Sequence, residues 1–573
     1  MRSHSLLAAG LAVLALLAPP GAGAQQPAFD LVVRAPAPLK ELLEKHLELR
    51  RYREVTDLDD AEIARLVVLA DKDARELLAT QGYFMPQVRI EREAGDRPTL
   101  VVAVEPGPVT RVSDVKIEFE GDIATSSEPD AIGQRQAIVG DWELPAERPF
   151  TQSRWDAAKA NASRRLIAKR YPAGRISYSL ADVDAATQSA RLGLRLDSGP
   201  VFRLGPIKVS GVERYEEVLI PRLARLPEGM VYDQEKIVKA QLRITGSGYF
   251  ESAFIFVDPE ADPNAAPVQV NLRESPLHKV VLGVGITTDS GPRASVEYLH
   301  NRVPGIGWRA VTKLQAERKS PFAQTEWTAI PGEDGWRWGV LARAERLDDD
   351  ELITHGQRLR VGRSKAGDHI DRNVYVQYER ATVQAKEGVP AILADIGDGT
   401  ALSVNYVWTG RYFDRLPFPT TGNGFGFELG GGITLSGTKS PFQRTVLRWQ
   451  GIRPFSQAVQ GRLQMRAEGG AVLARSSARV PSTQMFRTGG DTTVRGYGYR
   501  DIGVDRGGLE TNFESALFVD AGAVADRPND LRPAVGVGAG VRWKSPLGPF
   551  QVDLAYGVKA KSFRLHFNVG VTF

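Results

Sequence analysis

The last twelve residues of the chain, SFRLHFNVGVTF, alternate between apolar and polar side chains. In an extended strand the apolar ones share one face: Phe563, Leu565, Phe567, Val569, Val571 and Phe573. The opposite face carries Arg564, His566 and Asn568. One apolar face and one charged face are typical of a strand that separates lipid from a polar lumen, so this stretch predicts a strand of a transmembrane β-barrel.

The same alternation of apolar and polar residues begins near residue 276 and continues to the C-terminus, with many glycines. Tryptophans lie at the margins of the expected strands: Trp327, Trp336, Trp338 and Trp408. A soluble β-sandwich also alternates, but tryptophan margins and an apolar face that reaches the chain end favour a membrane barrel. At about 20 residues for each strand and its connection, residues 276-573 predict about 16 antiparallel strands, an even number as bacterial barrels need.

The N-terminus has the features of an export signal. A short basic region, MRSHS, is followed by the apolar run LLAAGLAVLALLA and by the small residues Ala22, Gly23 and Ala24, so we expect residues 1-24 to be a signal peptide. The chain contains no cysteine, which suits an oxidising compartment. No later stretch has the roughly 18 consecutive apolar residues of a transmembrane helix. The sequence therefore predicts an exported protein that enters a membrane only as a closed barrel.

Three similar segments precede the expected barrel. Each contains a helical pattern that ends at an aromatic residue: ARELLATQGYF, SRRLIAKRYP and KAQLRITGSGYF. Two strand-like runs follow each helix, so we expect three tandem α+β repeats with the order strand, helix, helix, strand, strand, at residues 25-106, 107-198 and 199-275. Phe150 and Thr151 predict the start of one helix, with Thr151 as the N-cap and Phe150 as the apolar residue before it. The free sheet edges could bind an extended client, and the alternative, plain scaffold modules, stays open.

A second motif lies near the C-terminus, in the glycine-rich stretch GGDTTVRGYGYRDIGVDRGG, which we expect to be a long loop. The following segment, NFESALFVDAGAV, alternates so that Asp520 points into the lumen. If the loop folds back into the barrel, the planar guanidinium of Arg495 can pair with the Asp520 carboxylate. The alternative is that Arg495 is a solvated turn residue.

These residues carry a resemblance to a known family. The loop has the motif VRGY, and the strand after it has the motif F-x-D-x-G; the residues are Val494, Arg495, Gly496 and Tyr497, then Phe518, Asp520 and Gly522. Together with the three repeats, they resemble the outer-membrane barrel-assembly superfamily, whose soluble repeats are called POTRA domains. The resemblance implies that the loop arginine locks against the strand aspartate inside the barrel. It also implies a protein of the outer membrane of a Gram-negative bacterium with its repeats in the periplasm.

Three repeats before a barrel of about 16 strands resemble the TamA branch of this superfamily, the barrel subunits of the translocation and assembly module. The resemblance implies a factor that folds and inserts β-barrel clients such as autotransporters. It implies as partners these unfolded clients, outer-membrane lipid and an inner-membrane-anchored TamB-like protein that docks on the first repeat. The closest alternative is a two-partner-secretion-type transporter that passes an exported protein through the lumen.

Closure of the barrel requires the first strand, Lys279–Asp289, to pair with the last strand, which ends at Phe573. We expect this seam to involve Leu282, Gly283, Gly285, Phe567 and Phe573. The two glycines weaken a strand, although crowding in the lumen would also call for small residues. The resemblance implies that clients are released sideways through this seam.

Other function classes have little support. The chain has neither HExxH nor GxSxG, its 7 histidines are scattered, and no phosphate-binding loop is present, so we expect no enzyme, cofactor or metal site. The net charge of +4, without a concentrated basic run, argues against nucleic-acid binding.

Overall fold

The computed structural model describes residues 29–572 except residues 54, 56–57, 94–97, 288–290, 349–351, 389–396, 415–418, 455–461, 487–512, 523–533, 546–547 and 559–560. The predicted signal peptide therefore lies outside the described residues. The chain forms two compact units. One comprises Met1–Pro206, Pro227–Glu235 and Val257–Val268; the other comprises Ile207–Leu226, Lys236–Phe256 and Gln269–Phe573.

The first of three small sheets has the strand order β1-β3-β2, and we call it, with its helices, the first repeat. Its elements are β1 (Asp30–Arg34), α1 (Ala37–His46), α2 (Leu49–Tyr52), α3 (Asp60–Thr80), β2 (Gln87–Glu93) and β3 (Thr99–Glu105). β3 pairs in parallel with β1 and antiparallel with β2, so the last strand in sequence lies in the middle. α3 begins with a capping box, in which the carboxylate of Asp59 accepts a hydrogen bond of 2.7 Å from the amide of Glu62.

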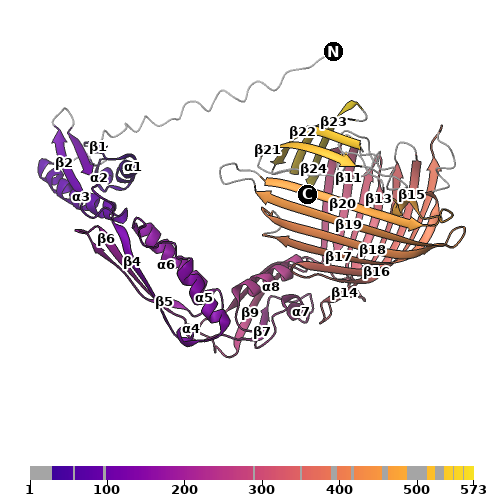
Figure 1. Cartoon of the computed structure of the whole chain (residues 1–573), viewed down its shortest axis with the longest axis horizontal. Helices are drawn as coiled ribbons and strands as arrows, with labels where there is room; N and C mark the ends of the chain where they lie inside the picture. Colours follow the sequence, from indigo (N-terminus) through magenta and orange to yellow (C-terminus); the bar gives the residue numbers. More distant parts are fainter. Residues whose placement is uncertain are drawn as a thin grey trace, which may run out of the picture. The chain divides into compact units, whose positions relative to one another are not determined.

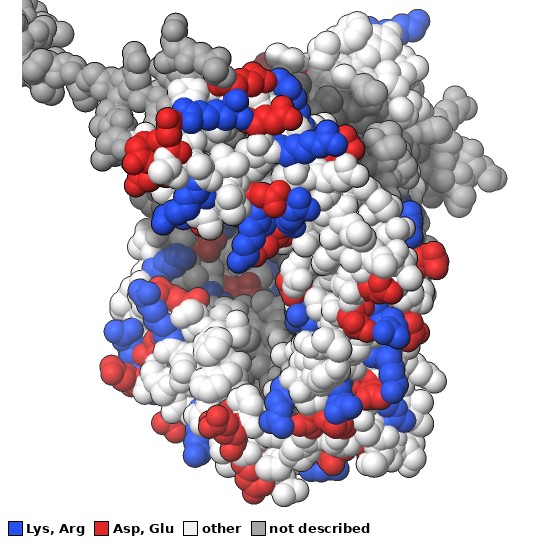
Figure 2. All heavy atoms as spheres, turned by 90° about the vertical axis from the view of Figure 1, so that its left-hand side faces the viewer, with Lys and Arg blue, Asp and Glu red and all other residues white. Residues whose placement is uncertain are grey.

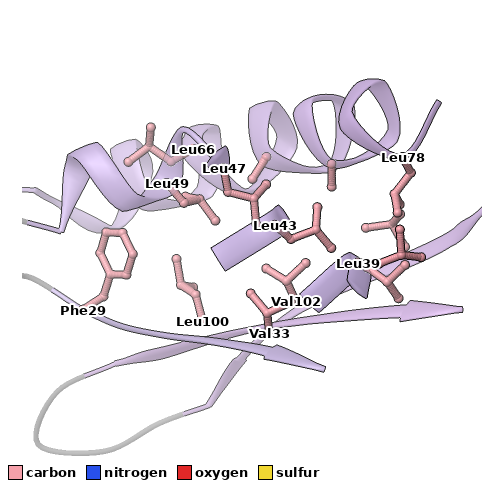
Figure 3. Close-up of a cluster of buried hydrophobic side chains, with 14 of the residues drawn as sticks. Phe29, Val33, Leu39, Leu43, Leu47, Leu49, Leu66, Leu78, Leu100 and Val102 are labelled. Atoms are coloured by element: carbon pink, nitrogen blue, oxygen red, sulfur yellow. The ribbon is translucent and has the colours of Figure 1, made fainter. Parts of the chain in front are cut away.

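The core of the first repeat lies between its helices and its sheet (Figure 3). The buried positions of α3 recur every three or four residues and give the helix one apolar face: Ile63, Leu66, Ala70, Ala74 and Leu78. They meet Leu43 of α1 and Leu100 of β3, which are fully buried. Burial of one such leucine contributes about 1.5–3 kcal/mol, so the repeat is held together mainly by these contacts.

The second repeat has the same arrangement, with the order β4-β6-β5. Its elements are β4 (Arg111–Glu120), α4 (Asp122–Thr125), α5 (Pro129–Gly140), α6 (Gln152–Ile167), β5 (Arg175–Asp184) and β6 (Ser189–Asp197). The start predicted for α6 is confirmed: Phe150 is buried, and the Thr151 hydroxyl accepts a hydrogen bond of 3.2 Å from the amide of Arg154. The turn at Gly82 is packed against this point, because a Cβ on Gly82 would lie 2.2 Å from the Phe150 carbonyl oxygen.

Charged side chains of both signs are interleaved on the face of the molecule seen in Figure 2. In the second repeat such pairs link β4 to β6 and β5 to β6, as in Arg195–Glu118 at 3.0 Å and Arg191–Asp182 at 2.7 Å. These pairs are exposed, and exposed pairs contribute about 0–1 kcal/mol each. They therefore add little to the stability that the apolar core provides.

The third repeat has the order β7-β9-β8. Its elements are β7 (Leu204–Ser210), α7 (Leu219–Ala224), α8 (Gln234–Gly246), β8 (Phe250–Val257) and β9 (Ala266–Glu274). The division between the two compact units runs through this repeat. Among the described residues, no helix combines the length and the apolar composition needed to cross a membrane.

All remaining strands belong to one antiparallel sheet that curves into a wall (Figure 1). The strands are β10 (His278–Thr287), β11 (Gly291–His300), β12 (Arg309–Glu317), β13 (Phe322–Thr328), β14 (Trp336–Asp348), β15 (Leu352–Lys365), β16 (Ile370–Ala385), β17 (Gly399–Phe413), β18 (Gly422–Thr434), β19 (Pro441–Pro454), β20 (Arg462–Ala474), β21 (Phe513–Gly522), β22 (Ala534–Ser545), β23 (Gly548–Gly557) and β24 (Ser562–Thr572). A short 3-10 helix, η1 (Ser482–Gln484), follows β20.

The strand order of this sheet runs from β20 back to β10, continues to β24 and ends at β21. Every described neighbour pair is antiparallel, so counting along the order shows that β20 and β21 run in the same direction as β10. The described part of the sheet contains 15 strands and no pairing between β20 and β21. A large antiparallel sheet is therefore present, while the number of about 16 strands stays a prediction.

Candidate functional site: the wall seam and the lumen

The side chains of the wall alternate between an apolar outer face and a polar inner face. On β10 the outer residues are Val280, Leu282, Val284 and Ile286, all between 45% and 56% exposed. On β16 the alternate positions Gln377 and Glu379 are buried inside, although both are polar. This is the pattern of a strand with lipid on one side and a polar interior on the other. The alternation predicted from the sequence therefore holds on both strands.

The two ends of the wall sequence meet at β10 and β24. The register pairs Gly283 with Thr572, Gly285 with Gly570 and Thr287 with Asn568, and the ladder contains 5 residue pairs among the residues that the structure describes. By comparison, β15 and β16 are joined by 14 pairs and β10 and β11 by 10. We call the β10–β24 ladder the seam, and it is the shortest ladder among the described neighbours in the wall.

The residues expected at the seam lie at different distances from this ladder. Gly283 and Gly285 are within it. Leu282 is opposite Val296 of β11, and Phe567 is opposite Val552 of β23. Each lies one position beyond an end of the described β10–β24 ladder. Phe573 lies outside the described residues.

The two halves of the predicted arginine–aspartate lock differ in what the structure describes. Val494, Arg495, Gly496 and Tyr497 all lie outside the described residues. Asp520 lies on β21 and is fully buried, while its neighbour Val519 is 52% exposed, so the carboxylate is on the inner face. Phe518 and Gly522 belong to the same strand, opposite Gly538 and Ala534 of β22. Asp520 makes an interaction in the structure, and its pairing with Arg495 stays a prediction.

A second buried carboxylate, Asp553 on β23, was not singled out from the sequence. It is fully buried and opposite Gly540 of β22, where a Cβ would lie 1.7 Å from the Asp553 Oδ1 atom. The glycine therefore makes room for the carboxylate. A lone acidic residue within the apolar alternation of PFQVDLAYG is the signal that points to it.

The chain that follows β20 enters the barrel interior. Val480 packs with Ala401 of β17 and Phe442 of β19, and all three are buried. A side chain at Gly399 would meet the carbonyl oxygen of Arg479 at 2.4 Å, so the segment passes close to the inner wall. We call residues 478–486 the inner segment; it is the described start of the connection that carries the VRGY motif.

The inner segment is held by a network of charged and polar groups. The side-chain amide of Gln484 donates a hydrogen bond to the carboxylate of Glu379, which is 1% exposed. Arg358 of β15 pairs with the same carboxylate at 2.7 Å, and Gln377 donates to it at 2.5 Å. Glu345 of β14 lies 3.6 Å from the Arg358 guanidinium. Glu379 is therefore the common acceptor that links the inner segment to two strands.

A second arginine fixes the backbone of the inner segment. Arg444 of β19 donates from Nε to the carbonyl oxygen of Gln484 at 3.1 Å and pairs with Glu428 of β18 at 2.7 Å. Its guanidinium also lies 5.1 Å from the ring centroid of Phe486, in a cation–π contact. A hydrogen bond to a charged group contributes about 1.5–3 kcal/mol, so these contacts are strong enough to hold a loop in place.

Sequence reasoning did not find this network. Gln484 and Glu379 are 105 residues apart, and their contact depends on a wall register that no local pattern contains. The available signal was the placement of Arg358 and Glu379 at inward positions of their strands.

The turns 301–308, 329–335 and 366–369 form one rim of the wall, which we call the repeat-side rim because it contacts the third repeat; the opposite end is the far rim. Arg243 of α8 pairs with Asp368 at 2.9 Å, and Arg225 donates to the Ala366 carbonyl at 2.8 Å. Glu274 of β9 supports this junction by accepting hydrogen bonds from three successive amides, at 3.0, 2.8 and 3.1 Å. Burial alone would raise the pKa of Glu274, but these amides hold it below its ordinary value.

In the part of the chain that the structure describes, no three acidic or histidine side chains are grouped closely enough to bind a metal ion. The chemistry that the inner face offers is ion pairing and hydrogen bonding. The outer face offers apolar contact, and the seam offers backbone donors and acceptors.

Comparison with known proteins agrees with this architecture. Residues 333–573 match the Omp85 superfamily domain. The Omp85 match spans β14 to β24 and so includes the inner segment, Asp520 and one strand of the seam.

The outer membrane protein assembly factor BamA of Nitratidesulfovibrio vulgaris is 24% identical over 450 residues, which are 69% of this chain and 55% of that protein. BamA of Neisseria meningitidis is 22% identical over 479 residues, 68% of this chain and 59% of that protein. The chain thus spans less than two thirds of the length of these relatives. The crystal structure of Haemophilus ducreyi BamA lacking POTRA domains 1-3 superposes with a TM-score of 0.56 at 16% identity, over 81% of this chain and 100% of that one. This structural likeness concerns the fold alone.

Proposed function

We propose that this protein is an outer-membrane assembly factor that helps to fold and insert β-barrel clients, such as autotransporters, through the β10–β24 seam. The observation that carries the proposal is the length of the seam in the described residues, 5 residue pairs against 14 between β15 and β16. In lipid, every unpaired backbone amide or carbonyl costs several kcal/mol, so an opened strand edge strongly favours pairing with another strand. A client strand can supply that pairing by β-augmentation.

The test is a disulfide across the seam. Val284 and Val571 are direct partners in the ladder, and opposite residues in an antiparallel pair bring their Cβ atoms to about 4.5–5.5 Å, close to the separation that a disulfide requires. Because the natural chain has no cysteine, the double variant Val284→Cys and Val571→Cys can form only the intended bridge within one chain. We expect the oxidised protein to lose insertion of an unfolded barrel client into liposomes and the reduced protein to recover it.

A matched control is available elsewhere in the wall. Val361 and Val376 are direct partners on β15 and β16, and both are exposed on the outer face. The double variant Val361→Cys and Val376→Cys should insert clients equally well when oxidised and when reduced. Full activity of the oxidised seam variant, with efficient crosslinking, would refute release through the seam.

Arg495 and Asp520 are proposed to form the lock that holds the connection inside the barrel. Three observations support it. Asp520 is buried on the inner face of β21, and the inner segment that begins the same connection already lies inside the wall. β20 and β21 also run in the same direction, so the C-terminal end of β20 and the N-terminal end of β21 lie at opposite rims of the wall.

At a finer level we propose that the protein is TamA-like. Three repeats with the same strand order precede the wall, and in this reading they are POTRA domains in the periplasm at about residues 25-106, 107-198 and 199-275. A TamB-like partner anchored in the inner membrane would dock on the first repeat. Co-purification of such a partner with the full chain, and its loss when β1 to β3 are replaced by those of the second repeat, is the test.

A further inference from the structure

A row of four outward-facing side chains crosses the wall at its repeat-side rim. They are successive partners in the register of β14 to β17: Trp336, Lys365, Arg372 and Trp408. Cross-strand partners share a face of the sheet, and Arg372 lies two residues from Val374, which is exposed on the outer face. Two cations are therefore directly opposite each other on the lipid side of the wall, with a tryptophan on either flank.

The tryptophans place this row at the membrane surface, because tryptophan is enriched where a bilayer meets water. On one side of the row the outer face of β15 and β16 is apolar and exposed: Leu359, Val361, Val374 and Val376. On the other side the strands end within a few residues at the turns of the repeat-side rim. Lys365 and Arg372 therefore lie at the depth of the lipid head groups, beside a surface that acyl chains can contact.

Neither cation forms an ion pair in the part of the chain that the structure describes. Like charges directly opposite each other in a sheet are destabilising, so the pair favours an anion between the two strands. A third cation adjoins them, since a Cβ on Gly335 would lie 3.4 Å from Arg225 Nη2 and 3.5 Å from Lys365 Cε. Arg225 donates to a backbone carbonyl and likewise has no carboxylate partner among the described residues.

The carboxylates at these strand ends are already engaged, apart from Glu333. Both oxygens of Asp334 accept hydrogen bonds, one from the amide of Trp336 at 3.0 Å and one from Arg363 at 3.1 Å. The others have their own partners: Asp368 with Arg243, Asp371 with Arg411, and Asp414 with the amides of Thr420 and Thr421. Glu333 is one exposed charge against the three unpaired cations, so the rim keeps an excess of positive charge.

We propose that this row binds the head group of an anionic phospholipid, with the phosphate between Lys365 and Arg372 and the acyl chains along the apolar outer face of β15 and β16. The inference rests on the outer-membrane location of the proposed function, which places the repeat-side rim at the periplasmic leaflet. Opposite residues of an antiparallel pair have Cβ atoms about 4.5–5.5 Å apart, so both side chains reach the oxygens of one phosphate. A zwitterionic phospholipid fits less well, because the cations repel its ammonium group.

The test titrates delipidated, detergent-solubilised full-length protein with phosphatidylglycerol and measures the dissociation constant of the first bound lipid by native mass spectrometry. One surface cation changes the affinity for an anionic lipid about fivefold, so Lys365→Gln and Arg372→Gln should each weaken binding about fivefold. Lys365→Arg keeps the charge and should bind as the natural protein does. Lys439→Gln removes an exposed lysine from the turn between β18 and β19 at the far rim, and it should leave binding unchanged.

Unchanged binding in Lys365→Gln and Arg372→Gln, in protein with heat-modifiable migration, would overturn the proposal. An equal loss in Lys439→Gln would also overturn it, because binding would then follow net charge rather than this row. The same holds for equal affinity of the natural protein for phosphatidylethanolamine, or for displacement of the lipid by an equal concentration of inorganic phosphate. The oxidised seam variant should still bind phosphatidylglycerol, so failure of this proposal is distinguished from failure of release through the seam.

Discussion

Replacement of Gln484 by alanine should release the inner segment from the wall. Among the described residues, the Gln484 side chain is the link in the Glu379 network that belongs to the segment itself, since Arg358 and Gln377 are strand residues. The alanine variant removes this link and leaves the Glu379–Arg358 pair intact. The wall should therefore keep its structure while the segment becomes less firmly held.

The magnitude follows from the type of bond that is lost. A hydrogen bond to a charged group contributes about 1.5–3 kcal/mol, and Glu379 is a buried carboxylate. The contact of Arg444 with the Gln484 carbonyl remains in the variant because it involves the backbone. We therefore expect the population of the released segment to increase about ten- to hundredfold.

The assay uses Ser482→Cys as a reporter. Ser482 is buried, and its hydroxyl has no hydrogen-bond partner among the described residues, so a thiol can replace it at little cost. The labelling rate with a membrane-impermeant maleimide measures the fraction of time that the segment is exposed. Adding Gln484→Ala to this variant should increase the rate about ten- to hundredfold.

The control is Gln443→Ala, which removes the same type of side chain from an exposed position of β19. This variant should label at the rate of Ser482→Cys alone. A change of less than twofold on adding Gln484→Ala, in protein that still shows heat-modifiable migration, would refute the claim that Glu379 holds the segment.

Three further predictions concern the lock, the junction and a helix cap. Arg495→Ala and Asp520→Ala should each reduce the fraction of heat-modifiable, folded barrel, and the charge-swapped double variant should recover part of it; unchanged folding in either single variant would contradict the lock. Glu274 has a lowered pKa in the folded protein, so its stabilising contribution is present above its ordinary value of 4.5 and is lost as the pH falls through the lower folded value. Thermal unfolding should therefore show Glu274→Gln to be destabilising at pH 7 and nearly neutral in acid below the folded pKa. Thr151→Ala removes the α6 cap and should destabilise that helix by about 1 kcal/mol, seen as about fivefold faster amide exchange in α6.

Local patterns predicted the features that depend on local geometry. A period of two along β21 predicted that Asp520 faces inward, and in the structure Asp520 is buried next to the exposed Val519. Phe150 and Thr151 located the start of α6, because an N-cap is a contact between residues three apart in sequence and so depends on local geometry alone.

Features that depend on long-range register could not be predicted in this way. The described β10–β24 ladder ends beside Leu282 and Phe567, where residues 573 and 288 lie outside the described part of the chain, so the place of both residues at the seam stays a prediction. The Gln484–Glu379 contact joins a turn to a strand on another part of the wall. Shifting a strand by one residue changes every partner, and nothing within a single strand specifies its register with a distant one.

The direction of β20 and β21 divides the wall into two panels. Eleven strands, β10 to β20, form one uninterrupted meander, and four strands, β21 to β24, form another. In the described part of the sheet, the four-stranded panel is hydrogen-bonded to the larger one only through the 5 pairs between β10 and β24. The β10–β24 ladder therefore joins two multi-stranded panels, and opening it would expose one edge strand on each panel. A client hairpin has two edges of its own, one for each of these strands.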